Sequence, residues 1–84
     1  MPSIGMHHRG TLMNTATFST GQTITRNSSK RFPFAWFAVN VQSKFTQINY
    51  GFASTEQNAT RAARAAFAGC GGKTTTEVVP ARFA

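Results

Sequence analysis

Acidic side chains are almost absent from this chain of 84 residues, which has two Glu, no Asp, and nine Lys and Arg, for a formal net charge of +7. General acid–base catalysis commonly needs paired carboxylates, and cages for Mg²⁺ or Ca²⁺ are built from carboxylate oxygens. Both are excluded when Glu56 and Glu77 are the only acids. The sequence therefore predicts a protein that is not an enzyme and that uses no metal, cofactor or small-molecule substrate.

Cysteine and long apolar runs are also scarce. Cys70 is the single cysteine, so no disulfide can form within the chain, which fits a reducing compartment. The longest strongly apolar run, 32–41, is about half as long as a membrane-spanning helix and is broken by Pro33. The N-terminus has no apolar signal-peptide core. These absences predict a cytoplasmic location, the host cytoplasm if the protein is phage-encoded, and no membrane partner.

What the sequence does contain is positive charge and aromatic residues, with eight Phe, one Trp and one Tyr. A small chain of this charge is typical of proteins that contact an anionic polymer, most often a nucleic-acid backbone. The length allows one small domain with an aromatic-rich core. We assign residues 1–14 to a flexible leader, 15–79 to a single domain and 80–84 to a C-terminal tail. The adjacent His7 and His8 of the leader are too few ligands for a metal site.

Three strands are expected before the helix. Residues 16–25 alternate loosely and are rich in Thr, with Gly21 as a bulge or bend. Residues 34–41 are apolar on both faces, which predicts a central strand, with one face on a helix and the face of Phe34 and Trp36 toward a second layer, a ligand or solvent. A short connection and a strand over 45–52 complete a hairpin.

One helix is expected over 57–68, since this segment is Ala-rich and follows a capping box at Ser54–Gln57. Glycines at 69, 71 and 72 end it. The β-prone segment 74–79 is either an edge strand or part of a tail. The predicted fold is therefore α+β: a three-stranded antiparallel sheet, four-stranded if 74–79 pairs, packed against one Ala-rich helix in the order strand, strand, strand, helix.

The stretch 69–74 reads Gly-Cys-Gly-Gly-Lys-Thr and is similar to a phosphate-binding loop. That motif needs a further Gly at position 67, which is Phe, and a helix that follows the glycines rather than precedes them. A helix C-cap explains these glycines better. Cys70 has no base or cation assigned beside it, so we expect a half-buried structural cysteine rather than a nucleophile.

The cations gather in a few predicted elements. They occupy one turn, the next connection and one side of the helix, and they are Arg26, Lys30, Arg31, Lys44, Arg61 and Arg64. If the first two strands pair, the turn and the connection lie at opposite ends of the central strand, on either side of one sheet face. Phosphate contacts spread along a surface have this distribution, as does a solvated basic face without a partner. An exposed Phe34 or Trp36 would add base stacking, whereas in the alternative interpretation both are core residues.

The stretch 36–67 resembles small DNA-binding domains made of a three-stranded sheet and a helix. It runs from an aromatic strand through a turn and a second strand into Tyr50-Gly51-Phe52-Ala53-Ser54-Thr55 and an Ala-rich helix. The arm-type domain of tyrosine recombinases and the ethylene-response-factor domain have this order, and the resemblance implies a sheet that lies in the major groove. The strand 34–41 carries no Arg or Lys, which favours phosphate contact over base reading.

In its size and general character the chain also resembles accessory proteins of phages and plasmids, including anti-CRISPR proteins. That resemblance implies an inhibitor that binds a host nucleoprotein complex, using Phe34 and Trp36 as anchors and the basic residues against an acidic protein surface. A small basic subunit of a ribonucleoprotein particle is a third alternative. The leading hypothesis is a non-enzymatic module that binds nucleic acid through its phosphates.

Overall fold

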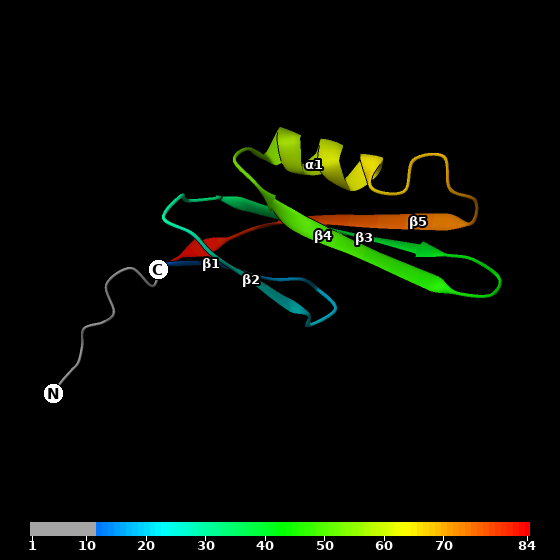
Figure 1. Cartoon of the computed structure of the whole chain (residues 1–84), viewed down its shortest axis with the longest axis horizontal. Helices are drawn as coiled ribbons and strands as arrows, with labels where there is room; N and C mark the ends of the chain where they lie inside the picture. The colour runs from blue at the N-terminus through cyan, green and yellow to red at the C-terminus, as the bar shows by residue number, and fades with distance from the viewer. Residues whose placement is uncertain (1–11) are drawn as a thin grey trace, which may run out of the picture.

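The computed structural model describes residues 12–84, and this part of the chain forms six strands and one helix (Figure 1). In chain order these are β1 (Met13–Thr17), β2 (Thr23–Asn27), β3 (Phe34–Val41), β4 (Thr46–Ala53), α1 (Glu56–Ala65), β5 (Lys73–Pro80) and β6 (Arg82–Phe83). The strands pair antiparallel in two sheets of three. The small sheet has the order β2-β1-β6 and the large sheet the order β4-β3-β5.

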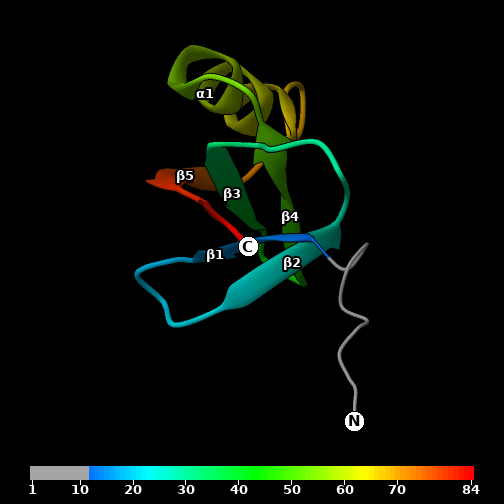
Figure 2. The same ribbon diagram turned by 90° about the vertical axis from the view of Figure 1, so that its left-hand side faces the viewer.

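The elements form three layers. The helix α1 covers one face of the large sheet, and the small sheet lies against the other face (Figures 1 and 2). The small sheet covers only the half of the large sheet where β3 begins, and the other half extends beyond it (Figure 1). The length of the strands explains this offset, because β1 and β2 have five residues each whereas β3 and β4 have eight.

The α+β class, the antiparallel pairing, the single helix of the described chain and the central position of β3 confirm the expectation from the sequence. The prediction of a single sheet was wrong, because the segment 16–25 contributes two strands of a hairpin rather than one bent strand. The Phe18 amide donates to the Gln22 carbonyl at 2.9 Å and the Gly21 amide to the Phe18 carbonyl at 2.8 Å. These bonds close a tight turn, so Gly21 reverses the chain instead of forming a bulge.

The folded part of the chain is wider than the predicted 15–79. Met13 and Asn14, which we assigned to the leader, begin β1. The assigned tail contains β6, which pairs with β1, and the backbones of Met13 and Ala84 exchange hydrogen bonds of 2.8 and 3.1 Å. Residues 1–11 of the leader, including His7 and His8, lie outside the described residues. The C-terminal residues are therefore a strand that completes the small sheet.

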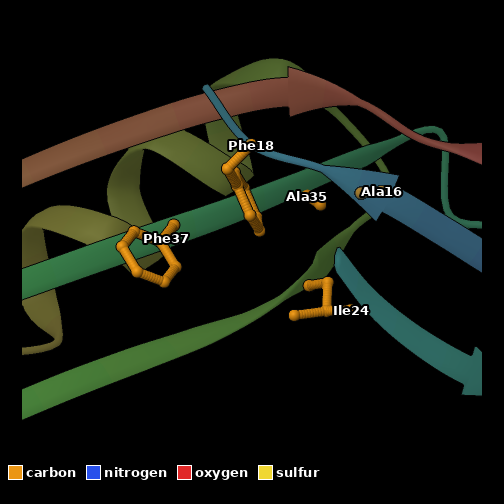
Figure 3. Packing of buried hydrophobic residues seen from close by; sticks show 5 residues of the cluster. All are labelled: Ala16, Phe18, Ile24, Ala35 and Phe37. Atoms are coloured by element: carbon orange, nitrogen blue, oxygen red, sulfur yellow. The ribbon is translucent and has the colours of Figure 1, made fainter. Parts of the chain in front are cut away.

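The main core lies between the two sheets. The small sheet and the residues next to its strands contribute Ala16, Phe18 and Ile24, and β3 contributes Ala35 and Phe37 (Figure 3). The rings of Phe18 and Phe37 pack with centroids 5.0 Å apart. Aromatic side chains bury the largest apolar areas, so this pair anchors the small sheet on β3.

The two faces of β3 are reversed relative to the prediction. Since Ala35 and Phe37 face the small sheet, alternation directs Phe34, Trp36 and Ala38 toward α1. The physical reason is size: Ala59 and Ala63 of the helix are fully buried and approach the fully buried Ala38 closely, whereas the larger Phe37 fills the space between the sheets.

The helix runs over 56–65 rather than the expected 57–68, and its N-cap is one residue later than the capping box predicted. Thr55, not Ser54, is the N-cap, and its hydroxyl accepts from the Asn58 amide at 3.0 Å. The helix ends at Ala65 and a turn leads to the glycines. Within residues 12–84 no helix has the length and apolar character needed to cross a membrane.

Candidate nucleic-acid interface

The six predicted cations are all exposed, but the structure does not gather them on one surface. Arg26 lies in β2 rather than in the predicted turn, and Lys30 and Arg31 lie in the connection from β2 to β3. Lys44 lies in the turn from β3 to β4, and Arg61 and Arg64 lie on α1. We call the region of the first three cations the loop end of the molecule and the region of Lys44 the hairpin end; they are the two ends of β3. Two carboxylates cannot neutralise nine cations, and Glu77 already accepts hydrogen bonds from the Ser19 amide and hydroxyl at 3.0 and 2.9 Å.

A buried asparagine fixes the backbone of the loop end. Asn14 is fully buried in β1, and its side-chain amide donates to the Lys30 carbonyl at 3.0 Å while its oxygen accepts from the Phe32 amide at 2.8 Å. Asn14 occupies the same inward-facing set as Ala16 and Phe18. An apolar residue there would leave the two loop groups unpaired. The bonds hold the segment that carries Lys30 and Arg31 in one conformation.

One aromatic ring brings two of these cations together. The guanidinium carbon of Arg26 lies 4.8 Å and the ammonium of Lys30 lies 5.2 Å from the centroid of the Phe32 ring. Phe32 in turn packs on Phe52 of β4, with centroids 6.3 Å apart. The ring attracts each cation and offsets part of the repulsion between them. With the neighbouring Arg31, the loop end presents three positive charges on a fixed backbone.

A second buried asparagine organises the hairpin end. Asn40 of β3 is fully buried, and its amide donates to the Gly71 carbonyl at 3.0 Å and to the Thr74 hydroxyl at 2.9 Å. Its oxygen accepts from the Gln42 side chain at 2.8 Å. Asn40 therefore ties together the end of β3, the loop after α1 and the start of β5.

The glycine loop packs directly against the end of β3. Gly72 has a φ of +82°, and a Cβ at this position would collide with the Val41 carbonyl oxygen. Only glycine satisfies both the left-handed backbone and the close approach. The following residue, Lys73, then enters β5 directly opposite Val41. Lys73 is exposed and joins Lys44 at the hairpin end; we did not predict it, although its place after the glycine loop marked it.

Apolar side chains are exposed where the large sheet extends beyond the small one. Opposed residues of an antiparallel pair share a face, so the register groups Ile48 with Val39 and Thr75, and Thr46 with Val41 and Lys73. One row closer to the start of β3, the same face carries Tyr50, Phe37 and Glu77. Val41, Ile48 and Tyr50 are 51%, 53% and 50% exposed. We call this surface the open face, made of Val39, Val41, Ile48, Tyr50, Lys73 and Thr75.

A hollow adjoins the open face where the turn between β1 and β2 approaches it. It measures about 400 Å³. The apolar side chains of Phe37 and Val39 line it together with polar residues, namely Ser19, Thr20, Thr75, Thr76 and Glu77. This hollow could not be predicted from the sequence, because it depends on where the small sheet ends.

The other predicted residues lie on the helix side of the large sheet. Phe34 and Trp36 are partly buried there, and the Trp36 indole lies across Gly51, where a Cβ would be 2.9 Å from its Nε1 atom. Arg61 and Arg64 are exposed on α1, away from its buried Ala59 and Ala63. The structure therefore brings neither the predicted aromatic pair nor the helix cations to the open face.

The remaining chemistry of the described chain is limited. Cys70 is exposed rather than half-buried as predicted, because it lies in the glycine loop outside the core. Within residues 12–84 no group of three or more His, Cys, Asp or Glu side chains is placed to hold a metal ion. No protein family, curated protein or solved structure matches this chain.

Proposed function

We propose that this protein is a non-enzymatic module that binds nucleic acid mainly through its phosphates. The observation that carries the proposal is the arrangement of exposed cations at both ends of β3, each set held by a fully buried asparagine. Positive charges on a fixed backbone lose little conformational freedom when they bind an anion. An excess of cations that the two acids cannot neutralise attracts a polyanion over distance.

The spacing of the two ends suits an extended backbone. The eight residues of β3 separate them by about 25 Å, at about 3.3 Å per residue. One strand of a duplex carries a phosphate about every 3.4 Å along the axis, so about seven phosphates cover this distance. The cations at the two ends that would contact them are Arg26, Lys30, Arg31, Lys44 and Lys73. Arg61 and Arg64 lie on the opposite layer and have a secondary role in this proposal.

The test is the salt dependence of binding. Fluorescence anisotropy of a labelled duplex, measured from about 50 to 200 mM salt, should give a slope of log affinity against log salt of about −4.5 for five phosphates. Replacing Lys30→Gln together with Arg31→Gln should lower the affinity and reduce the slope by about 1.8. The matched control is Arg61→Gln with Arg64→Gln, which removes equal charge from the helix and should change the slope by less than half as much.

Two results would contradict the proposal. One is the absence of binding to duplex DNA, single-stranded DNA and RNA at the lowest salt concentration. The other is an equal loss of affinity from both double variants, which would indicate a general charge effect without a defined surface. Salt-sensitive capture of an acidic protein from a nucleoprotein complex, without affinity for nucleic acid, would support the inhibitor hypothesis instead.

A further inference from the structure

We infer that the open face binds the unpaired bases of a single-stranded nucleic acid, with Lys44 and Lys73 on the adjoining phosphates. This inference rests on the proposed function and specifies the form of nucleic acid. The observation behind it is that exposed apolar side chains and cations share one end of the large sheet. Phosphate binding explains the cations there but not the apolar side chains.

The apolar part of the open face needs a ligand with apolar surface of its own. Val41, Ile48 and Tyr50 are each about half exposed and lie on one continuous face of β3 and β4. A duplex presents phosphates and the edges of its base pairs, and its base faces are stacked inside. An unpaired base offers a planar face that stacks on an aromatic side chain, and every base offers one. Tyr50 is the aromatic side chain placed to receive it.

The charge around the open face fits an anionic ligand better than a second copy of the chain. Lys73 belongs to the face itself, and Lys44 lies in the two-residue turn beyond Val41, closed by a 2.9 Å bond from the Gln42 amide to the Phe45 carbonyl. Two copies with a net charge of +7 each would repel one another. A single strand joins both requirements in one molecule, since its bases are apolar and its backbone is negative.

The one acid on this side of the sheet is already hydrogen-bonded within the chain. Glu77 lies two strands from Tyr50, about 10 Å across the sheet. Both of its carboxylate oxygens accept hydrogen bonds from Ser19. Two donors of the turn between β1 and β2 therefore offset part of its charge at the edge of the hollow that it lines.

The hollow beside the open face gives the base a defined position. Its volume of about 400 Å³ lies within the usual range of small-ligand sites, about 300–1,000 Å³. Phe37 and Val39 supply apolar surface, and the hydroxyls of Thr20 and Thr75 can donate to or accept from the edge of a base. When one base stacks on Tyr50, the next base along the nucleic-acid strand can therefore reach the polar groups of the hollow.

The experiment compares a labelled oligo(dT) of twelve nucleotides with a twelve-base-pair duplex at the same low salt concentration. Tyr50→Ala should lower the affinity for the single strand about tenfold, as expected for the loss of one stacked base, and leave the duplex affinity within about twofold. Tyr50→Phe keeps the ring and should restore most of the affinity. Because Tyr50 is exposed on an edge strand, both variants should fold, which circular dichroism would verify.

Phe45→Ala is the matched control. Phe45 is as exposed as Tyr50, but it is opposite Gln42, whose side chain bonds to Asn40 on the helix side of the sheet. Its loss should change single-strand affinity by less than threefold. An equal loss from Phe45→Ala and Tyr50→Ala would overturn the inference, since it would show that any exposed aromatic contributes.

Amide NMR with the oligo(dT) locates the ligand directly in a chain of 9.1 kDa. The inference expects the largest shifts at Val39, Val41, Ile48 and Tyr50. Binding to both nucleic acids with shifts confined to the loop end would overturn it and leave the proposed function standing, whereas no binding to either would remove both. Light scattering tests the alternative that two copies pair through the open face. If Tyr50→Ala changes the molecular mass in solution but leaves the oligo(dT) affinity unchanged, the open face is an interface between copies and the inference is overturned.

Discussion

The two ends of β3 use the same components in different ways. Each has a fully buried asparagine that fixes a loop, and each has exposed cations and aromatic residues. At the loop end Phe32 is covered by Arg26 and Lys30 of the same chain. On the open face, which runs from the hairpin end to the middle of β3, Tyr50 is half exposed, and the cations lie at the border of the apolar surface rather than over it.

The difference follows from strand length. The five-residue strands of the small sheet are three residues shorter than β3 and β4, which leaves about 10 Å of the large sheet uncovered. The covered half supplies the core and the rigid attachment of the loop end. The uncovered half leaves apolar rows without a partner in the described chain. The loop end therefore offers charge alone, and the hairpin end offers charge together with apolar surface.

The largest predicted effect concerns the two asparagines. Asn14→Ala should lower the free energy of unfolding by about 2–4 kcal/mol, because it leaves the Lys30 carbonyl and the Phe32 amide without partners. Asn40→Ala removes three hydrogen bonds and should cost about the same. Urea unfolding measures both effects.

The double variant tests whether the two ends are independent. Sites separated by the length of β3 and without shared partners should give additive losses within about 0.5 kcal/mol. A larger deviation would show that the two ends are coupled through β3 and do not act as separate regions. A change of slope in the urea transition would instead indicate that a variant no longer unfolds in two states.

The next effect tests the close packing of the hairpin end. Gly72→Ala should destabilise the protein by about 2 kcal/mol, because a left-handed backbone disfavours a side chain and the new Cβ would meet the Val41 carbonyl. Gly71→Ala is the matched control, since a Cβ there meets nothing within 4 Å, and it should change stability by less than about 0.5 kcal/mol. Thermal unfolding of the two variants side by side would measure the difference. Equal midpoints would show that the glycine loop moves to accommodate the new Cβ at no cost.

Local patterns in the sequence were sufficient for several elements. The alternation of 34–41, the hairpin into 45–52 and the Ala-rich helix depend on neighbours in the chain, and all three are present. The second sheet depends on a contact between the two ends of the chain, where two residues of β6 pair with β1. A strand so short has no periodicity to detect, which is why 80–84 was predicted as a tail.

The site shows the same division between local and distant information. The three groups of cations followed from their positions in the predicted elements, but the place of Arg61 and Arg64 on the layer opposite the open face required the layers of the fold. The shared face of Ile48 and Tyr50 was readable from alternation, yet their exposure depends on the point where the small sheet ends. The predicted outward position of Trp36 was wrong, because the small Ala38 admits the helix on that face of β3, whereas the larger Phe37 fills the space between the sheets.

The smallest effect tests the covered ring at the loop end. Phe32→Leu keeps an apolar side chain against Phe52 but removes the aromatic face beneath Arg26 and Lys30, so stability should fall by about 1 kcal/mol. Phe45→Leu at the hairpin end is the matched change, since within residues 12–84 no cation lies over that ring, and it should cost less than about 0.5 kcal/mol. A double-mutant cycle with Arg26→Gln should give a coupling of about 0.5–1 kcal/mol with Phe32. Zero coupling would mean that Arg26 lies near the ring without a stabilising interaction. The loop end would then differ from the hairpin end in geometry but not in energy.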